Sequence, residues 1–209
     1  MKTSAHTDFI HRFIPAADVA SAPTLLLLHG TGGNENDLLE LGRSLAPGAN
    51  LLSPRGKILE NGMPRFFRRL AEGVFDEEDL IFRTHELADF TAAAADHYGF
   101  SRSSLDAVGY SNGANIAASL MLLRPEILSR AVLLRAMVPL VPEKTPDLSG
   151  RKILLESGAH DPILPIGNAR RLAEMFRNAG ADVTHDTLDA GHQLTSAELN
   201  TARLWLAQT

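Results

Sequence analysis

The sequence predicts an α/β fold in which helices flank a mostly parallel central sheet. Short apolar runs alternate with longer amphipathic stretches along the chain, which is typical of strand–helix–strand units. The chain has 209 residues, of which 44% are hydrophobic and 22% are charged. This length and composition predict a single domain over residues 1–209, and they exclude a disordered chain, a collagen-like chain and a coiled coil.

Apolar or alternating runs predict a sheet of about seven strands. Residues 24–28 are continuously apolar apart from one threonine, as expected for a strand that helices cover on both faces. Similar runs predict strands at residues 50–54, 105–110, 131–135 and 152–156. The alternating segment 182–188 is expected nearer an edge, and residues 9–14 are expected to add a strand antiparallel to the others.

Helices are predicted between these strands, at residues 34–45, 80–97, 112–123, 166–179 and 196–207. Asn34 or Asn36 is the expected N-cap of the first helix. Residues 112–123 are almost all apolar or small, so this helix is expected to be buried. The 16 residues 136–151 contain three prolines, which predicts a loop in place of a large cap domain and therefore an open, shallow site.

The strongest chemical motif is Gly109-Tyr110-Ser111-Asn112-Gly113, which lies between a predicted strand and a predicted helix. A sharp turn of this G-x-S-x-G type exposes the serine hydroxyl, and its glycines leave room for neighbouring elements. The helix N-terminus adds free N–H groups beside the reacting oxygen. The motif predicts Ser111 as a nucleophile; the alternative is a purely structural Gly/Ser turn.

A serine nucleophile needs a base, and the base needs a group that orients it. Ligands of a parallel sheet bind beyond the carboxyl ends of the strands, and Asp161 and His192 both follow predicted strands there. The chain order Ser111, Asp161, His192 is the one that α/β-hydrolases have. We therefore predict that His192 takes the Ser111 proton and that Asp161 fixes the imidazole tautomer. Taken alone, each would be an ordinary loop residue.

The glycine-rich segment His29-Gly30-Thr31-Gly32-Gly33-Asn34 follows the first long strand. The backbone N–H groups of Thr31 and Asn112 are predicted to form an oxyanion hole. A phosphate-binding loop is disfavoured, because neither G-x-G-x-x-G nor G-x-x-x-x-G-K-[ST] is present. His29 is expected to be a structural residue that hydrogen-bonds to this loop.

These motifs and their spacing resemble the small phospholipase/carboxylesterase branch of the α/β-hydrolases, which includes the acyl-protein thioesterases. The resemblance lies in residues 28–38, 109–113, 158–162 and 191–192 and so spans nearly the whole chain. Residues 65–80 are most similar to bacterial carboxylesterases associated with hydroquinone or catechol stress. The resemblance implies an α/β-hydrolase fold, a triad of Ser111, Asp161 and His192, oxyanion donors at Thr31 and Asn112, and a tendency to form homodimers.

Two positions depart from the thioesterases. Asn112 stands where they usually have glutamine, and Gly30-Thr31-Gly32-Gly33 replaces a Gly-Leu-Gly-Asp loop. We interpret the chain as a serine hydrolase of small-molecule carboxylic esters, with thioesters as a further substrate class, that uses an acyl-enzyme intermediate and no cofactor. Two alternatives on the same fold are a non-catalytic ligand-binding protein and an acyltransferase.

Composition also bears on partners and location. The net charge of −5 gives no general attraction to nucleic acid or anionic membranes. There is no cysteine, and the eight histidines show no recognised ligand spacing, so no metal is predicted. Residues 1–8 are polar and lack the apolar core of a signal peptide, so a cytoplasmic protein without membrane insertion is expected. Arg65, Arg68 and Arg69 favour either an anionic substrate or a solvated charge cluster.

Overall fold

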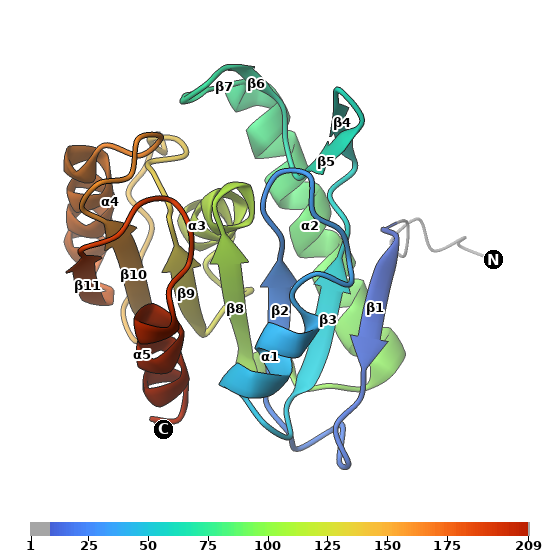
Figure 1. Cartoon of the computed structure of the whole chain (residues 1–209). Coiled ribbons are helices and arrows are strands. Elements are labelled where there is room, and N and C mark those ends of the chain that lie inside the picture. Colours follow the sequence, from blue (N-terminus) through green and yellow to red (C-terminus); the bar gives the residue numbers. More distant parts are fainter. Residues whose placement is uncertain (1–8, 209) are drawn as a thin grey trace.

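The computed structural model describes residues 9–208, and the polar N-terminal segment 1–8 lies outside the described residues. Its centre is a seven-stranded sheet in the order β1-β3-β2-β8-β9-β10-β11 (Figure 1). All neighbouring strands are parallel except β1, which pairs antiparallel with β3. The strands are β1 (His11–Ile14), β2 (Thr24–Leu28), β3 (Asn50–Pro54), β8 (Leu105–Tyr110), β9 (Arg130–Leu134), β10 (Lys152–Gly158) and β11 (Asp182–Leu188).

The expected α/β architecture and the antiparallel N-terminal strand are confirmed. β11 is an edge strand, as the alternation of its residues predicts. The helices are α1 (Leu39–Leu45), α2 (Glu77–Tyr98), α3 (Asn112–Leu123), α4 (Ile166–Asn178) and α5 (Ser196–Leu206). The segment 136–151 contains no helix, so the loop expected there is present in place of a helical cap.

Alternate residues of the central strands pack against opposite layers of helices. Leu25 and Leu27 of β2 belong to a core that includes residues of α1 and α5. Leu26 and Leu28 belong to a larger core that includes residues of α2, α3 and α4. Figure 1 shows α1 and α5 on the near face of the sheet. Burial on both faces explains why every residue of β2 after Thr24 is a leucine.

The first helix is shorter than predicted, and neither Asn34 nor Asn36 is its N-cap. The Asn36 N–H donates to the Asn34 side chain, and the Asn34 N–H donates to the Asp37 side chain. These local side-chain bonds stabilise turns over residues 34–38, so the helix starts only at Leu39.

Two small hairpins between β3 and α2 were not predicted. β4 (Ile58–Glu60) pairs with β5 (Met63–Arg65), and β6 (Arg69–Ala71) pairs with β7 (Val74–Phe75). In Figure 1 both stand beyond the carboxyl ends of the central strands. The Gly32 N–H donates to the Pro64 carbonyl at 2.9 Å, which joins this segment to the glycine-rich loop after β2. The hairpins therefore form part of the rim at the end of the sheet where ligands bind.

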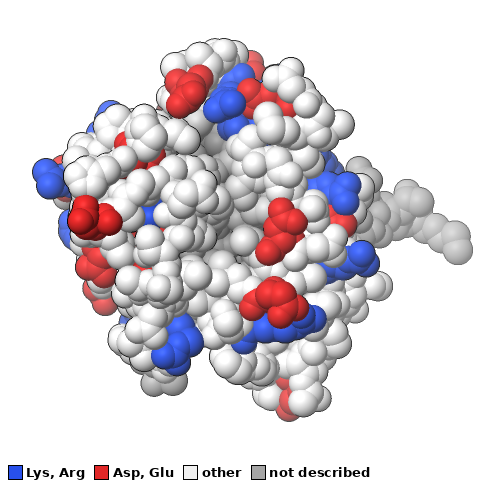
Figure 2. Space-filling view, viewed as in Figure 1, with Lys and Arg blue, Asp and Glu red and all other residues white. Residues whose placement is uncertain are grey.

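Charged side chains do not form a single-sign surface on the face shown in Figure 2, where acidic and basic groups are mixed. None of the helices within residues 9–208 has the length and apolar character needed to cross a membrane.

Candidate active site

Ser111 occupies a strained turn between β8 and α3. Its φ of 53° and ψ of −114° lie in a region that residues other than glycine rarely adopt. Its N–H donates to the Leu134 carbonyl at 2.9 Å, which ties the turn to β9. A Cβ at Gly113 would lie 2.0 Å from the Leu28 carbonyl oxygen, and one at Gly109 would lie 2.5 Å from the Gly113 carbonyl oxygen. The two glycines are required because neighbouring backbone approaches within contact distance.

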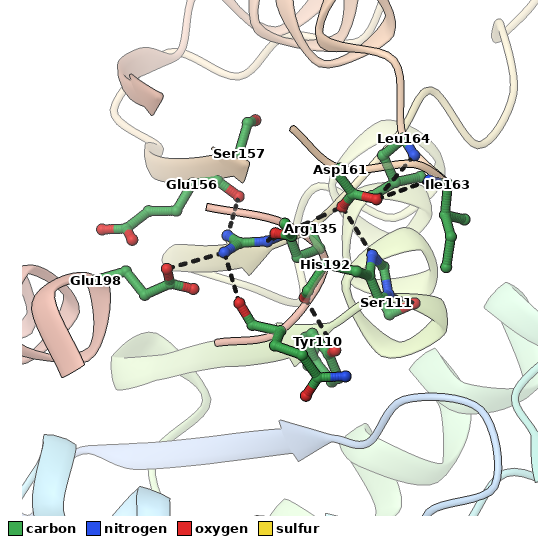
Figure 3. Close-up of polar contacts among 12 residues, drawn as sticks. Tyr110, Ser111, Arg135, Glu156, Ser157, Asp161, Ile163, Leu164, His192 and Glu198 are labelled. Carbon is green, nitrogen blue, oxygen red and sulfur yellow. Dashed lines mark hydrogen bonds and ion pairs between the residues drawn. The ribbon is translucent and has the colours of Figure 1, made fainter. Parts of the chain in front are cut away.

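The structure brings Ser111, His192 and Asp161 together from three separate loops (Figure 3). His192 Nε2 lies 3.1 Å from Ser111 Oγ, and His192 Nδ1 lies 2.7 Å from Asp161 Oδ2. The other carboxylate oxygen, Asp161 Oδ1, accepts the N–H groups of Ile163 and Leu164 at 2.9 and 3.1 Å. These two bonds fix the carboxylate, so its second oxygen faces the imidazole.

This geometry determines the proton positions in the neutral site. The Asp161 carboxylate only accepts hydrogen bonds, so the proton of neutral His192 sits on Nδ1. Nε2 then carries a free lone pair directed at the Ser111 hydroxyl. Chemically, this arrangement allows Nε2 to accept the serine proton and allows the carboxylate to stabilise an imidazolium.

The N–H groups of Thr31 and Asn112, the predicted oxyanion donors, both belong to residues that line the same cavity as Ser111. Within the described residues neither N–H donates a hydrogen bond to the protein. The side chain of Asn112 is anchored by the Phe66 N–H, which donates to its Oδ1 at 2.7 Å. Thr31 Oγ1 accepts from Arg65 Nη1 at 2.6 Å. Residues 58–75, which contain the two unpredicted hairpins (the hairpin segment), thus hold both candidate donors in place.

The cavity that contains these groups has a volume of about 340 Å³. Polar and apolar side chains both line it, and the lining residues include Phe75, Tyr110, Asn115, Met137, Ile163 and Leu164. This size is near the lower end for small-molecule sites, so the cavity fits a compact substrate.

Arg135, which follows β9, holds the loop that carries His192. Its side chain is fully buried, and its Nε and Nη2 donate to the carbonyls of Gly191 and Gln193 at 2.9 and 3.0 Å. Nη2 also pairs with Glu198 Oε2 at 2.9 Å (Figure 3). The Tyr110 hydroxyl donates to the carbonyl of His192 itself at 3.1 Å. Three consecutive carbonyls of the loop are therefore held by side chains, which fixes the position of the imidazole.

Comparison with known proteins identifies the family of the chain. Residues 10–209 match the phospholipase/carboxylesterase family. The chain belongs to this family. It is 51% identical over 181 residues to MhqD of Bacillus subtilis (strain 168), covering 87% of this chain and 90% of that protein.

Two solved structures agree with this assignment. The carboxylesterase of Bacillus cereus is 49% identical with a TM-score of 0.92, covering 95% of this chain and 93% of that one. The carboxylesterase from Mesorhizobium loti is 33% identical with a TM-score of 0.89, covering 96% and 95% of the two chains. These matches confirm the α/β-hydrolase fold and the family resemblance that the motifs imply.

In this family member, sequence reasoning missed the buried ionic groups behind the site. Arg135 is the last residue of the predicted strand 131–135, and nothing in that position indicates its contacts with the His192 loop. Glu156 and Glu198 are also fully buried. The available signal was a charged residue at the end of each of two apolar runs, 131–135 and 152–156. Such a residue is buried only when other groups pair with it or neutralise it.

His29 has the structural position that the sequence suggests. Its Nδ1 donates to the Gly30 carbonyl at 2.7 Å, and its Nε2 accepts the Gly56 N–H at 3.0 Å. Burial lowers the pKa of His29, which keeps the ring neutral and able to accept that bond.

Glu156 makes folding stability depend on pH. Its carboxyl oxygens are buried without a hydrogen-bond partner among the described residues. Burial, with the nearby carboxylates of Glu198 and Asp186, raises the pKa of Glu156 to about 8. Between about pH 4.5 and about pH 8, the folded state therefore keeps a proton on Glu156 that the unfolded chain has lost. The stabilisation is complete below about pH 4.5 and is lost as the pH rises to about 8.

We expect Glu156→Gln to remove this loss. The amide stays neutral at every pH, so the variant should gain stability over the wild type as the pH rises from 5 to 8, by on the order of a few kcal/mol. Urea unfolding at pH 5, 6.5 and 8 measures the difference, with the exposed Glu126→Gln as the control. Parallel stability curves for Glu156→Gln and the wild type would show that this carboxyl ionises normally.

Proposed function

We propose that this protein is a serine hydrolase that cleaves small carboxylic esters through an acyl-enzyme intermediate. The observation that carries the proposal is the continuous hydrogen-bonded path from Ser111 Oγ through His192 to Asp161. Membership of the phospholipase/carboxylesterase family and the similarity to two carboxylesterases support ester hydrolysis.

In the first half of the proposed reaction, Ser111 Oγ attacks the ester carbonyl while its proton passes to His192 Nε2. The negative charge that develops on the carbonyl oxygen is stabilised by the N–H groups of Thr31 and Asn112. The bond to the alcohol oxygen then breaks, and the alcohol leaves with the proton from Nε2. Asp161 stabilises the imidazolium throughout this step.

The second half releases the acid. Water gives a proton to His192 Nε2 as it attacks the acyl carbon, and the new oxyanion occupies the same place. The bond to Ser111 Oγ breaks, Oγ takes the proton back from Nε2, and the carboxylic acid leaves. No cofactor takes part in these steps, so the chain itself supplies every group that moves a proton.

The cavity limits the substrate. About 340 Å³ accommodates a short acyl group together with a small alcohol, and thioesters of similar size follow the same chemistry. We further propose a cytoplasmic location, since the chain contains no cysteine for the disulfides common in secreted enzymes.

The proposal is tested by assaying purified protein with p-nitrophenyl acetate, butyrate and octanoate, and with an acetyl thioester. We expect turnover of the short oxygen esters and weaker turnover of the octanoate. Stoichiometric inactivation by diethyl p-nitrophenyl phosphate is expected as well, because only an activated serine reacts with it. A protein that binds these esters without hydrolysing them, and that resists the phosphate, would be a non-catalytic binding protein.

A further inference from the structure

The hairpin segment places Arg65 in the wall of the cavity that contains Ser111. Arg65 ends β5, and its side chain is only 4% exposed. Nη1 donates to Thr31 Oγ1 at 2.6 Å, and Nε donates to the Phe67 carbonyl at 3.3 Å. Nη2 makes no hydrogen bond to any residue in the range 9–208. It is also not one of the buried side-chain nitrogens and oxygens that lack a partner there, so it is accessible. The guanidinium therefore keeps one donor group available to a molecule in the cavity.

Positive charge is in excess around this guanidinium. Arg65 and Arg69 share one carboxylate, that of Glu60, at 3.2 and 2.9 Å. Burial and the charge of Arg69 lower the pKa of Arg65, which is the effect of a cation held with too little water and too little negative charge. Glu72 also lines the cavity, but it is exposed at the rim, where solvent screens its charge.

Residues of α3 add further donors to the cavity. Asn112 and Asn115 line the cavity from α3, and their amide oxygens accept the N–H groups of Phe66 and Met137 at 2.7 and 2.9 Å. These bonds leave the amide nitrogens as donors. Asn112 Nδ2 is fully enclosed, with no partner among the described residues, so the amide nitrogen of Asn115 is the one available to a molecule in the cavity. The lining is thus rich in donors, and a group that only accepts hydrogen bonds complements it.

The geometry points to an ester that carries a carboxylate on a short acyl chain, with Arg65 binding that carboxylate. This inference rests on the proposed function and adds the substrate class to it. Thr31 supplies both a candidate oxyanion N–H and the hydroxyl that Arg65 binds, so the guanidinium lies one side chain away from the expected ester carbonyl. A guanidinium whose Nη2 group is free can donate to a carboxylate, and its burial strengthens the attraction. The nearly complete burial of Arg65 argues against a solvated charge cluster.

A matched pair of substrates tests the inference on the wild-type protein. Methyl hydrogen succinate and methyl butyrate differ in that a carboxylate replaces the terminal methyl group. We expect kcat/KM to be roughly tenfold or more higher for the succinate ester, because charged hydrogen bonds are among the stronger ones. Raising the salt concentration from 0.05 to 0.5 M should lower this preference.

Variants assign the preference to Arg65. Arg65→Met is expected to reduce the ratio of the two kcat/KM values by roughly tenfold, and Arg65→Lys to retain part of it, because it keeps the charge. The ratio is the readout, so a loss of activity common to both esters cancels. Arg68→Met is the matched control, since Arg68 is 59% exposed and does not line the cavity; its ratio should equal that of the wild type.

The outcomes separate this inference from the proposed function. A wild-type preference for methyl butyrate, or a ratio that is the same in Arg65→Met, would overturn the carboxylate site and leave the esterase intact. Failure of the wild type to hydrolyse either ester would count against the esterase itself. If Arg65→Met does not fold, the wild-type preference and its salt dependence still decide the question.

Discussion

Replacing Ser111 with alanine is expected to reduce kcat for p-nitrophenyl acetate by about 10⁴-fold or more. The reason is that, among the described residues lining the cavity, no other hydroxyl hydrogen-bonds to the His192 imidazole. The substitution removes one oxygen from the cavity wall, so circular dichroism and the melting temperature should stay close to those of the wild type. Stopped-flow or plate-reader release of p-nitrophenolate measures the effect.

Ser119→Ala supplies a matched control for this prediction. Ser119 lies on the same helix, α3, and its hydroxyl donates to the Asn115 carbonyl away from the cavity lining. Loss of this bond should lower the stability by about 1 kcal/mol. It should change kcat by only a few-fold. A Ser111→Ala protein with the wild-type rate would remove Ser111 from the reaction.

Arg135→Met is expected to destabilise the protein by about 3–5 kcal/mol, because it leaves the Glu198 carboxylate buried without its cation. It also removes the side-chain bonds to the carbonyls of Gly191 and Gln193. The loop that carries His192 is then less constrained, so kcat should fall more than KM rises. Urea unfolding and steady-state kinetics at a temperature well below the melting transition measure the two effects.

A double substitution tests the physical cause. In Arg135→Met/Glu198→Met neither charge remains, so the protein should recover part of the stability that Arg135→Met loses. The activity should not recover, because the bonds to the His192 loop are still missing. A single variant that loses less than about 1 kcal/mol, or a double variant less stable than the single one, would contradict a buried ion pair as the cause.

The main layers of the fold could be predicted from sequence because the hydrophobic pattern of each strand lies within the strand itself. The run at 24–28 indicates a strand buried on both faces, and the alternation at 182–188 indicates an edge. The start of α1 could not be predicted in the same way. Helical spacing of leucines extends to residue 38, but the polar side chains of residues 34–37 form competing local bonds.

Among the residues of the site, too, some could be predicted from local sequence and others could not. Ser111, Asp161 and His192 could be named in advance, since a local turn motif and the ends of predicted strands identify them. The roles of Arg65 and Arg135 depend on partners far along the chain, at Thr31 and at residues 191–198. The sequence names Arg65 as one of three arginines suited to an anionic substrate, but no local pattern indicates its bond to Thr31 or the contacts of Arg135 with the His192 loop.

The most direct test of the convergence of Ser111, His192 and Asp161 is to trap the acylated protein. Wild-type protein is mixed with p-nitrophenyl acetate, quenched in acid within the first turnover, and digested for peptide mass spectrometry. We predict one acetyl group per chain, on Ser111, and none on that residue in His192→Ala under the same conditions. Acetylation of a different side chain, or steady hydrolysis without any acylated Ser111, would contradict the proposed chemistry.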